Sequence, residues 1–356
     1  MGTPGGVGSP GGVGSPGGVG SPGGFGSTVA PERVLKELSA LWVSEERNGG
    51  AGDGVLRACS MTLVVLAESS DDAPALGETI AALMPQHPAR AVVISLSGAG
   101  PRALADRVQQ QCWKPFGLGK QICCEQIEIT VSDEALADLP SVLLPLAVPD
   151  LPVIVWCRSS RLVTMPEFGE IARMATKVVV DSAAFADAGD AIRWMAEVVE
   201  SGLAIGDLSW TRLTRWREML SHVFDNRDYL AKLAGIGEVR VEFRRPLAVS
   251  AWLMGAWIAG ALEDAGVKAA LSVVELDEAG GQSALHVELA GSDLHVDLSR
   301  QEERLVITVN SLSNCTNLPQ PSDYLLMREE LGIVRRDAVF ERSLASAARL
   351  AFRTEP

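Results

Sequence analysis

The chain has 356 residues, of which 47% are apolar and 21% charged, and its formal net charge is −14. This length exceeds what one hydrophobic core usually organises, so we expect two domains. The excess of acidic over basic residues argues against a broad surface that binds nucleic acid or anionic membranes, because both need clustered positive charge. The longest apolar run, 247–262, is shorter than the roughly 20 residues that span a bilayer, and it predicts a buried helix.

The first 30 residues differ in composition from the rest. Residues 5–22 repeat GGVGSP three times, and 23–28 form a degenerate copy. Such a segment has few side chains that could build a core, so it predicts a disordered tail over 1–30. It has neither a basic start nor a continuous apolar stretch of the kind found in secretory signals, and we expect a cytoplasmic protein.

Residues 31–235 alternate between helical and strand patterns. Strands are predicted at 61–68, 90–97, 120–132, 151–157 and 176–182, and helices at 32–46, 71–86 and 190–202. Short β-branched runs that alternate with helices are typical of a mostly parallel sheet covered on both faces. This part therefore predicts an α/β domain.

Residues 236–356 show a different pattern. A strand at 238–243 precedes the long apolar helix, and strand-like runs follow at 269–276, 283–289, 294–299 and 304–309. Short polar connections between the last three runs indicate hairpins. Two helices, at 323–332 and 339–352, complete the chain. The pattern predicts a smaller α+β domain with an antiparallel meander.

The segment after the strand at 90–97 contains a G-x-G-x-x-A pattern at Gly98, Gly100 and Ala103, and Pro101 could begin a helix. A strand, a glycine turn and a helix together can hold a pyrophosphate on backbone amides. The pattern follows the second strand of the domain, however, and no acidic residue stands at the expected strand end. A simple turn is the alternative interpretation.

Six cysteines, at 59, 112, 123, 124, 157 and 315, lack the spacing of a secreted disulfide scaffold, so we expect mostly reduced thiols. No zinc site is expected, because the four histidines are dispersed and no CxxC pair occurs. Strand alternation makes Cys124 the more solvated neighbour of Cys123. A bridge between the two would strain the backbone, whereas pairing with Cys112 is geometrically possible. Inert thiols and a redox switch both remain open.

The segment 208–218, LSWTRLTRWRE, carries two tryptophans and three arginines. With Ser209 as the helix cap, a core stripe is predicted at Leu213, Trp216, Leu220, Val223 and Phe224. Trp210 falls outside that stripe, and Arg212 and Arg215 share another face. Because a cation in the first turn opposes the helix dipole, Arg212 needs an anionic partner, either Asp207 or a group of a bound molecule.

The sequence DLSWTRLTRWRE at 207–218 resembles the D-x-x-W-T-R-L-T-P-W-R signature of the OpcA family of glucose-6-phosphate dehydrogenase assembly proteins. The run LPLAVPDLPVIVWCR at 144–158 is similar to that family's LP-x-x-x-PDLPV-x-x-WW region, and 87–94 and 120–129 have counterparts too. The resemblance extends from about Met61 to Gly332. Arg215 replaces a common proline of the family, and Cys157 replaces a usual second tryptophan.

The resemblance implies a protein without catalytic activity or cofactor that assembles and activates glucose-6-phosphate dehydrogenase. We expect the partner to bind an exposed surface formed by Trp210, Thr211, Arg212, Thr214, Arg215 and Arg217. Thiol sensitivity at Cys123 and Cys124 is a possible extension, since some members in photosynthetic bacteria carry it. The alternative function is a sugar-phosphate or nucleotide-binding enzyme or sensor that uses the glycine turn at 98–100 or the arginine-rich helix start.

Overall fold

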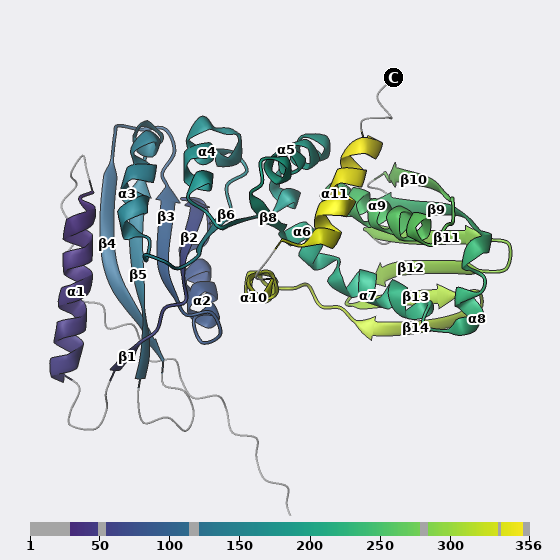
Figure 1. The fold of residues 1–356 in the computed structure, drawn as a ribbon, viewed down its shortest axis with the longest axis horizontal. Coiled ribbons are helices and arrows are strands. Elements are labelled where there is room, and N and C mark those ends of the chain that lie inside the picture. The colour runs from purple at the N-terminus through teal and green to yellow at the C-terminus, as the bar shows by residue number, and fades with distance from the viewer. Residues whose placement is uncertain (1–28, 49–54, 114–120, 278–283, 334–335, 352–356) are drawn as a thin grey trace, which may run out of the picture.

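The computed structural model describes residues 29–48, 55–113, 121–277, 284–333 and 336–351. These residues form two β-sheets and the helices packed on them (Figure 1). The glycine-rich repeats predicted to form a disordered tail lie outside the described residues. None of the helices in the described ranges is long and apolar enough to cross a membrane.

Within these ranges the first sheet has eight strands in the order β1-β5-β3-β2-β6-β7-β8, with β4 paired to β5. Neighbouring strands are parallel except for the antiparallel β4–β5 pair. The strands are β1 (Val55–Arg57), β2 (Met61–Glu68), β3 (Ala89–Leu96), β4 (Leu104–Trp113), β5 (Gln121–Val131), β6 (Val153–Cys157), β7 (Lys177–Val180) and β8 (Ala204–Asp207). The predicted mostly parallel sheet is confirmed.

The central strands follow a known topology. Without β1 and β4, six strands remain in the order β5-β3-β2-β6-β7-β8. Numbered along the chain with β2 as the first strand, this order is 3-2-1-4-5-6. This is the strand order of doubly wound dinucleotide-binding sheets, in which a ligand lies at the carboxyl ends of the first and fourth strands. In this chain those strands are β2 and β6.

Helices cover both faces of the first sheet. Val64 and Leu66 of β2 belong to a core shared with α1 (Pro31–Asn48), α3 (Leu139–Leu146), α4 (Pro166–Arg173) and α5 (Ala188–Glu200). Leu63 and Val65 point the other way, into a core with α2 (Ala73–Leu83) and α10 (Asp323–Gly332). Because both faces are covered, the strand is apolar at nearly every position rather than at every second one.

The second sheet has the order β10-β9-β11-β12-β13-β14, parallel between β9 and β10 and antiparallel elsewhere. Helices α7 (Thr214–Val223) and α9 (Ala248–Asp264) pack on one of its faces. The strands are β9 (Ile236–Phe243), β10 (Ala270–Glu275), β11 (Leu285–Gly291), β12 (His295–Gln301), β13 (Arg304–Val309) and β14 (Leu312–Asn317). The predicted meander is confirmed, with β14 as an additional edge strand.

The two sheets are joined by elements that lie between them in Figure 1: α6 (Leu208–Arg212), α10 and α11 (Ala338–Ala351). Helix α10 packs on α2 and α6, and α11 packs on α5 and α9. The sequence assigns both C-terminal helices to the second domain, yet Leu326 and Met327 of α10 lie in the core of the first sheet. The predicted boundary near residue 235 therefore stays a prediction.

One predicted element is wrong. Pro101 does not begin a helix: the chain instead enters β4, which runs antiparallel to β5 from Leu104 to Trp113. The amide of Ala103 donates to Ser132 Oγ at 2.9 Å, which ties the turn to the end of β5. Pairing with a long neighbouring strand decides the conformation here, and local propensity is only a weak guide in such a case.

Candidate functional site

The tryptophan- and arginine-rich segment forms two short helices rather than one. Asp207, not Ser209, caps the first, since its carboxylate accepts from the Ser209 amide at 3.1 Å. Helix α6 ends at Arg212, and α7 begins at Thr214. The predicted core stripe is otherwise confirmed, with Leu213, Trp216, Leu220 and Val223 buried and Phe224 packed against the same core.

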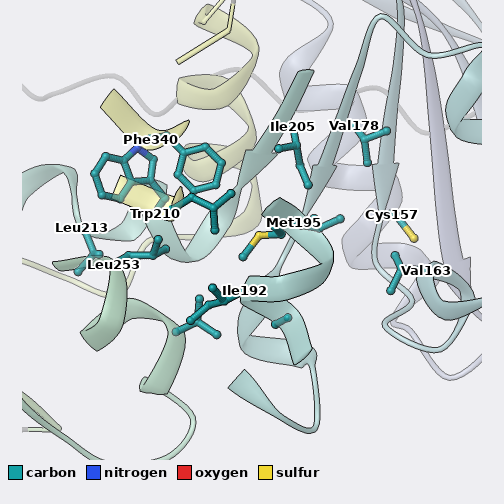
Figure 2. Close-up of a cluster of buried hydrophobic side chains, with 14 of the residues drawn as sticks. Cys157, Val163, Val178, Ile192, Met195, Ile205, Trp210, Leu213, Leu253 and Phe340 are labelled. Carbon is teal, nitrogen blue, oxygen red and sulfur yellow. The ribbon is translucent and has the colours of Figure 1, made fainter. Parts of the chain in front are cut away.

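Trp210 is not an exposed anchor. Its side chain is only 2% exposed and faces Phe340 of α11, with ring centroids 5.6 Å apart (Figure 2). The indole Nε1 donates to Asp337 at 3.0 Å. The prediction that this residue is available to a partner is wrong, because the helix that follows Asp337 folds back over it. Trp210 holds α6 to α11.

A buried ion pair joins α10 to the first sheet. Lys177, at the start of β7, lies 2.6 Å from Glu330 Oε1 and also donates to the carbonyl oxygens of Glu330 and Ile333. Thr211 donates its hydroxyl to Glu330 Oε2 at 2.9 Å, so it too is buried and not at a partner surface. A Cβ atom on Gly206 would lie 1.9 Å from Glu330 Oε1. We call Lys177, Gly206, Thr211 and Glu330 the latch.

Most of the latch could not be recognised from the sequence. Lys177 and Glu330 are 153 positions apart and stand in ordinary strand and helix patterns. The one available signal was a charged residue at each position, and charged residues are common at the ends of elements. Only their burial, with side chains 8% and 3% exposed, marks them as a pair.

Arg212 has an anionic partner, as predicted, but the partner is Asp181 rather than Asp207. Two guanidinium nitrogens donate to the two Asp181 oxygens, each at 2.7 Å. Asp207 is fully buried and accepts from the Ser182 amide, the Ser182 hydroxyl and the Ser209 amide. Burial, with a further contribution from the charge of Asp181, raises the pKa of Asp207 to about 7.

The remaining arginines of the segment have different environments. The guanidinium of Arg217 lies 3.5 Å from the centre of the Trp210 ring. Thr214 donates to Glu329 of α10 at 2.6 Å. Arg215 is the exposed member of the set, with 71% of its side chain accessible and Glu218 2.8 Å away. The segment therefore mainly holds the C-terminal helices in place, and of the residues predicted to bind a partner only Arg215 is exposed.

The position where a dinucleotide would bind carries carboxylates. Asp72 caps α2 by accepting from the Ala75 amide at 3.0 Å, which occupies the helix terminus that holds pyrophosphate in dinucleotide folds. Arg158, just after β6, pairs with Asp71 at 3.1 Å and with Asp323 of α10. The turn from β2 to α2 has the sequence ESSDDAP and lacks the G-x-G-x-x-G/A glycines found at this turn in dinucleotide-binding folds. These charges oppose a bound phosphate.

Neither phosphate site proposed from the sequence has the geometry it requires. The glycine turn at 98–100 leads into β4 rather than into the helix that the predicted phosphate site requires. The arginine-rich helix start is closed by the Asp207 cap and by the Arg212–Asp181 pair. In the part of the chain that the structure describes, no group of three His, Cys, Asp or Glu side chains is arranged to hold a metal ion.

The cysteines agree with expectation in part. Cys123 forms a disulfide with Cys112 across the β4–β5 pair, the pairing that the sequence left possible, and the other four cysteines are free thiols. Cys124 is not the more solvated neighbour: it is 1% exposed, and its thiol donates to the Ala58 carbonyl. Burial raises the pKa of Cys124 to about 11, which keeps it protonated and unreactive.

The fold and the site together define a two-sheet α/β protein with the strand order of a dinucleotide-binding sheet and carboxylates at the nucleotide position. A family model described as glucose-6-phosphate dehydrogenase subunit N-terminal domain matches residues 80–197, and the corresponding C-terminal domain model matches 203–344. The chain belongs to this family, the OpcA family of glucose-6-phosphate dehydrogenase assembly proteins.

Among curated proteins, the chain is similar to the OxPP cycle protein OpcA of Synechocystis, with 28% identity over 40% of this chain and 30% of that protein. The counterpart in Synechococcus elongatus is 24% identical over 50% of this chain and 40% of its own length. The matched stretch thus spans less than half of these relatives.

Among solved structures, a dehydrogenase from Chromobacterium violaceum has a TM-score of 0.44 at 11% identity, over 84% of this chain and 94% of that one. An aldose-aldose oxidoreductase from Caulobacter crescentus has a TM-score of 0.42 at 13% identity, over 82% and 96% of the two chains.

Proposed function

We propose that this chain is a non-catalytic assembly factor and activator of glucose-6-phosphate dehydrogenase. The observation that carries the proposal is the match of both family domains, at 80–197 and 203–344, each described as a subunit of that dehydrogenase. An activator of this kind binds the active form of the enzyme more tightly than the inactive form and so shifts the population toward activity.

The nucleotide position supports a non-catalytic role. Hydride transfer needs a bound nicotinamide dinucleotide, and the pyrophosphate of such a cofactor is held by helix amides and by glycines that allow close approach. Asp71 and Asp72 stand at that place here, and Asp323 adds a third carboxylate from α10. The chain has the strand order of a dinucleotide-binding sheet, but carboxylates stand where the pyrophosphate of the dinucleotide would bind.

The proposal is tested with the purified full-length chain and the dehydrogenase from the same cell. We expect the rate of NADP reduction by the dehydrogenase to rise with the concentration of this chain. The chain alone, given glucose 6-phosphate and NADP, should produce no NADPH. Turnover by the chain alone would contradict the non-catalytic role, and an unchanged dehydrogenase rate together with no binding in sedimentation would contradict the activator role.

We place thiol sensitivity at Cys112 and Cys123 rather than at Cys124. The disulfide joins the edge strand β4 to β5, and Cys112 is exposed and accessible to a reductant. We expect reduction to change the stimulation given by the native chain and to leave that of Cys112→Ser unchanged. Cys59→Ser is the matched control, because that cysteine is outside the disulfide. If reduction changes the stimulation given by Cys112→Ser as much as that given by the native chain, the Cys112–Cys123 disulfide is not the thiol-sensitive group.

A further inference from the structure

The strand β14 is an exposed edge of the second sheet. Among the described residues it is the outermost strand and pairs only with β13 (Figure 1). Each of its six residues is exposed. The other strands at sheet margins, β1, β4, β8 and β10, each contain a charged residue, whereas the sequence LSNCTN has neither a charge nor a proline. Charges and prolines commonly prevent an edge strand from pairing with another chain, so β14 is open to such pairing.

The register between β13 and β14 shows which backbone groups are directed outward. Leu318, just beyond β14, donates its amide to the carbonyl of Glu303 at 2.6 Å, so the even-numbered residues of this strand direct their backbone groups toward β13. The side-chain oxygens of Thr308 and Ser313 lie 2.9 Å apart, as expected of an opposed pair without backbone hydrogen bonds. Three residues therefore direct their amides and carbonyls away from β13: Ser313, Cys315 and Asn317.

One of these outward groups already has a local partner. The amide of Cys315 donates to the side-chain oxygen of Asn314 at 2.8 Å. Because Asn314 is exposed, its side chain can turn into water when a main-chain acceptor replaces it. The Cys315 amide can therefore join a ladder with another strand without leaving a buried group unpaired.

The strand is complementary to a second copy of itself. Antiparallel pairing about a two-fold axis at Cys315 opposes that residue with its own copy, and Ser313 with Asn317 in both directions, so all outward groups are paired. Between these pairs, Asn314 lies opposite Thr316. Each of the polar pairs can exchange a side-chain hydrogen bond, and no pair opposes like charges.

An exposed leucine selects the register and the occupant. Leu312 is 67% exposed, and it lies on the same face of the strand as Leu318 because the two are six positions apart. Pairing about Cys315 places Leu312 opposite Leu318 of the second copy, at both ends of the interface. A register with Asn314 on the axis would instead place Leu312 opposite Thr316. The apolar pair thus favours one register with a second copy of this chain, since an unrelated strand would not have the matching leucines in place.

We infer that two copies of this chain associate through β14 and form one continuous sheet. Only one strand of each copy lies in the contact, so the interface is smaller than the roughly 800 Å² per partner of a standard complex, and the dimer should dissociate on dilution. The inference concerns association of the chain with itself and does not depend on the proposed function.

Two substitutions at one position test the inference in the full-length chain. Cys315→Lys places two positive charges opposite each other on the axis, whereas Cys315→Ser keeps a small side chain there. We expect the native chain and Cys315→Ser to dimerise in sedimentation as their concentration rises. Cys315→Lys should need at least about tenfold more protein for the same fraction of dimer. Because the position is exposed, thermal unfolding should stay close to that of the native chain.

A second pair of variants tests the leucine contact. Leu312→Ser removes the apolar pair at both ends of the interface and should also weaken dimerisation. Leu144→Ser is the matched control, because Leu144 lies on α3 of the first sheet and is 65% exposed. It should dimerise as the native chain does.

Mild oxidation reports the register. The Cα atoms of directly opposed residues in a hydrogen-bonded antiparallel pair lie about 5.5 Å apart, which a disulfide can span. Oxidation should therefore give a covalent dimer of the native chain and of Cys59→Ser, and none of Cys315→Ser. A native dimer that forms no covalent product would show that Cys315 does not lie on the axis and would overturn the inference.

Other outcomes would also overturn it. A native chain that stays monomeric at every concentration excludes the dimer, and equal dimerisation of the native chain and Cys315→Lys places the contact elsewhere. If the chain is monomeric alone, binds the dehydrogenase, and loses that binding in Cys315→Lys, the edge takes a strand of the dehydrogenase. In that case the inference is wrong while the proposed function stands.

Discussion

The two sheets of this protein use polar residues in opposite ways. The first is covered on both faces, and Lys177 and Asp207 lie buried within it with partners inside the molecule. Among the described residues, the second is covered by helices on one face only, and the polar network at His286 lies on its other face. Polar groups of the first sheet therefore join distant elements inside the molecule, whereas the His286 network of the second joins neighbouring strands near its surface. Three predictions test this contrast.

The largest effect is expected at the latch. Glu330→Ala removes the partner of a buried lysine and should lower the free energy of unfolding by about 3–5 kcal/mol, because Lys177 then keeps an uncompensated charge. Urea denaturation measures the change. Lys177→Met combined with Glu330→Leu should be more stable than Glu330→Ala alone. The exposed Glu78→Ala is the control, and equal losses from Glu78→Ala and Glu330→Ala would refute the contrast between buried and exposed charges.

A smaller effect is expected at Asp207. The pKa of this carboxyl is raised to about 7 in the folded chain, above the ordinary value of about 3.9 in an unfolded one. The protonated form is therefore favoured by folding, and this stabilisation is lost as the pH rises from about 4 to about 7. Three hydrogen-bond donors to the carboxylate moderate the loss.

The variant Asp207→Asn carries no titrating proton and should lack this pH dependence. We expect the native chain to lose unfolding free energy relative to Asp207→Asn between pH 5 and pH 8, as measured by urea titrations at each pH. A constant difference between the two chains over that range would mean that the donors outweigh the burial of the charge.

The smallest effect is expected at His286 on the second sheet. Burial alone would lower the pKa of His286, but Asp297 and Glu242 together raise it above 6.5. The charged form thus adds stability that is fully present below pH 6.5 and is lost as the pH rises through the raised pKa. His286→Gln should cost at most about 1 kcal/mol near pH 6, as for other partly exposed ion pairs, and less at pH 9. A larger cost at pH 9 than at pH 6 would contradict this assignment.

The elements of the fold were largely predictable from local patterns. The apolar runs at β2, β3, β6 and β7 and the alternation at β11, β12 and β13 are strong signals, and each strand lies where its pattern indicated. The strands missed, β1, β4, β8 and β14, lack such a signal. β1 has only three residues and β8 only four, polar residues fill much of β4, and β14 is exposed throughout. Pairing with a neighbour makes them strands.

The candidate site was less predictable, since its residues were visible but their roles were not. The motif around Trp210 indicated the family, and the helical spacing identified Leu213 and Trp216 as core. Spacing along one helix cannot reveal that a helix more than 100 residues later covers the remaining face. Trp210 and Thr211 were therefore expected on the surface, although Asp337 and Glu330 bury them.

The sequence by itself determined the class of the two domains, the family and the apolar faces of the helices, because these depend on periodicity and on short contiguous motifs. Only the tertiary structure decided the partners of the charged groups. Arg212 meets Asp181, Lys177 meets Glu330, and Arg158 meets Asp323 through contacts between distant segments. Electrostatic interactions depend on distance in space and on exclusion of water, and neither quantity can be read from position along a chain.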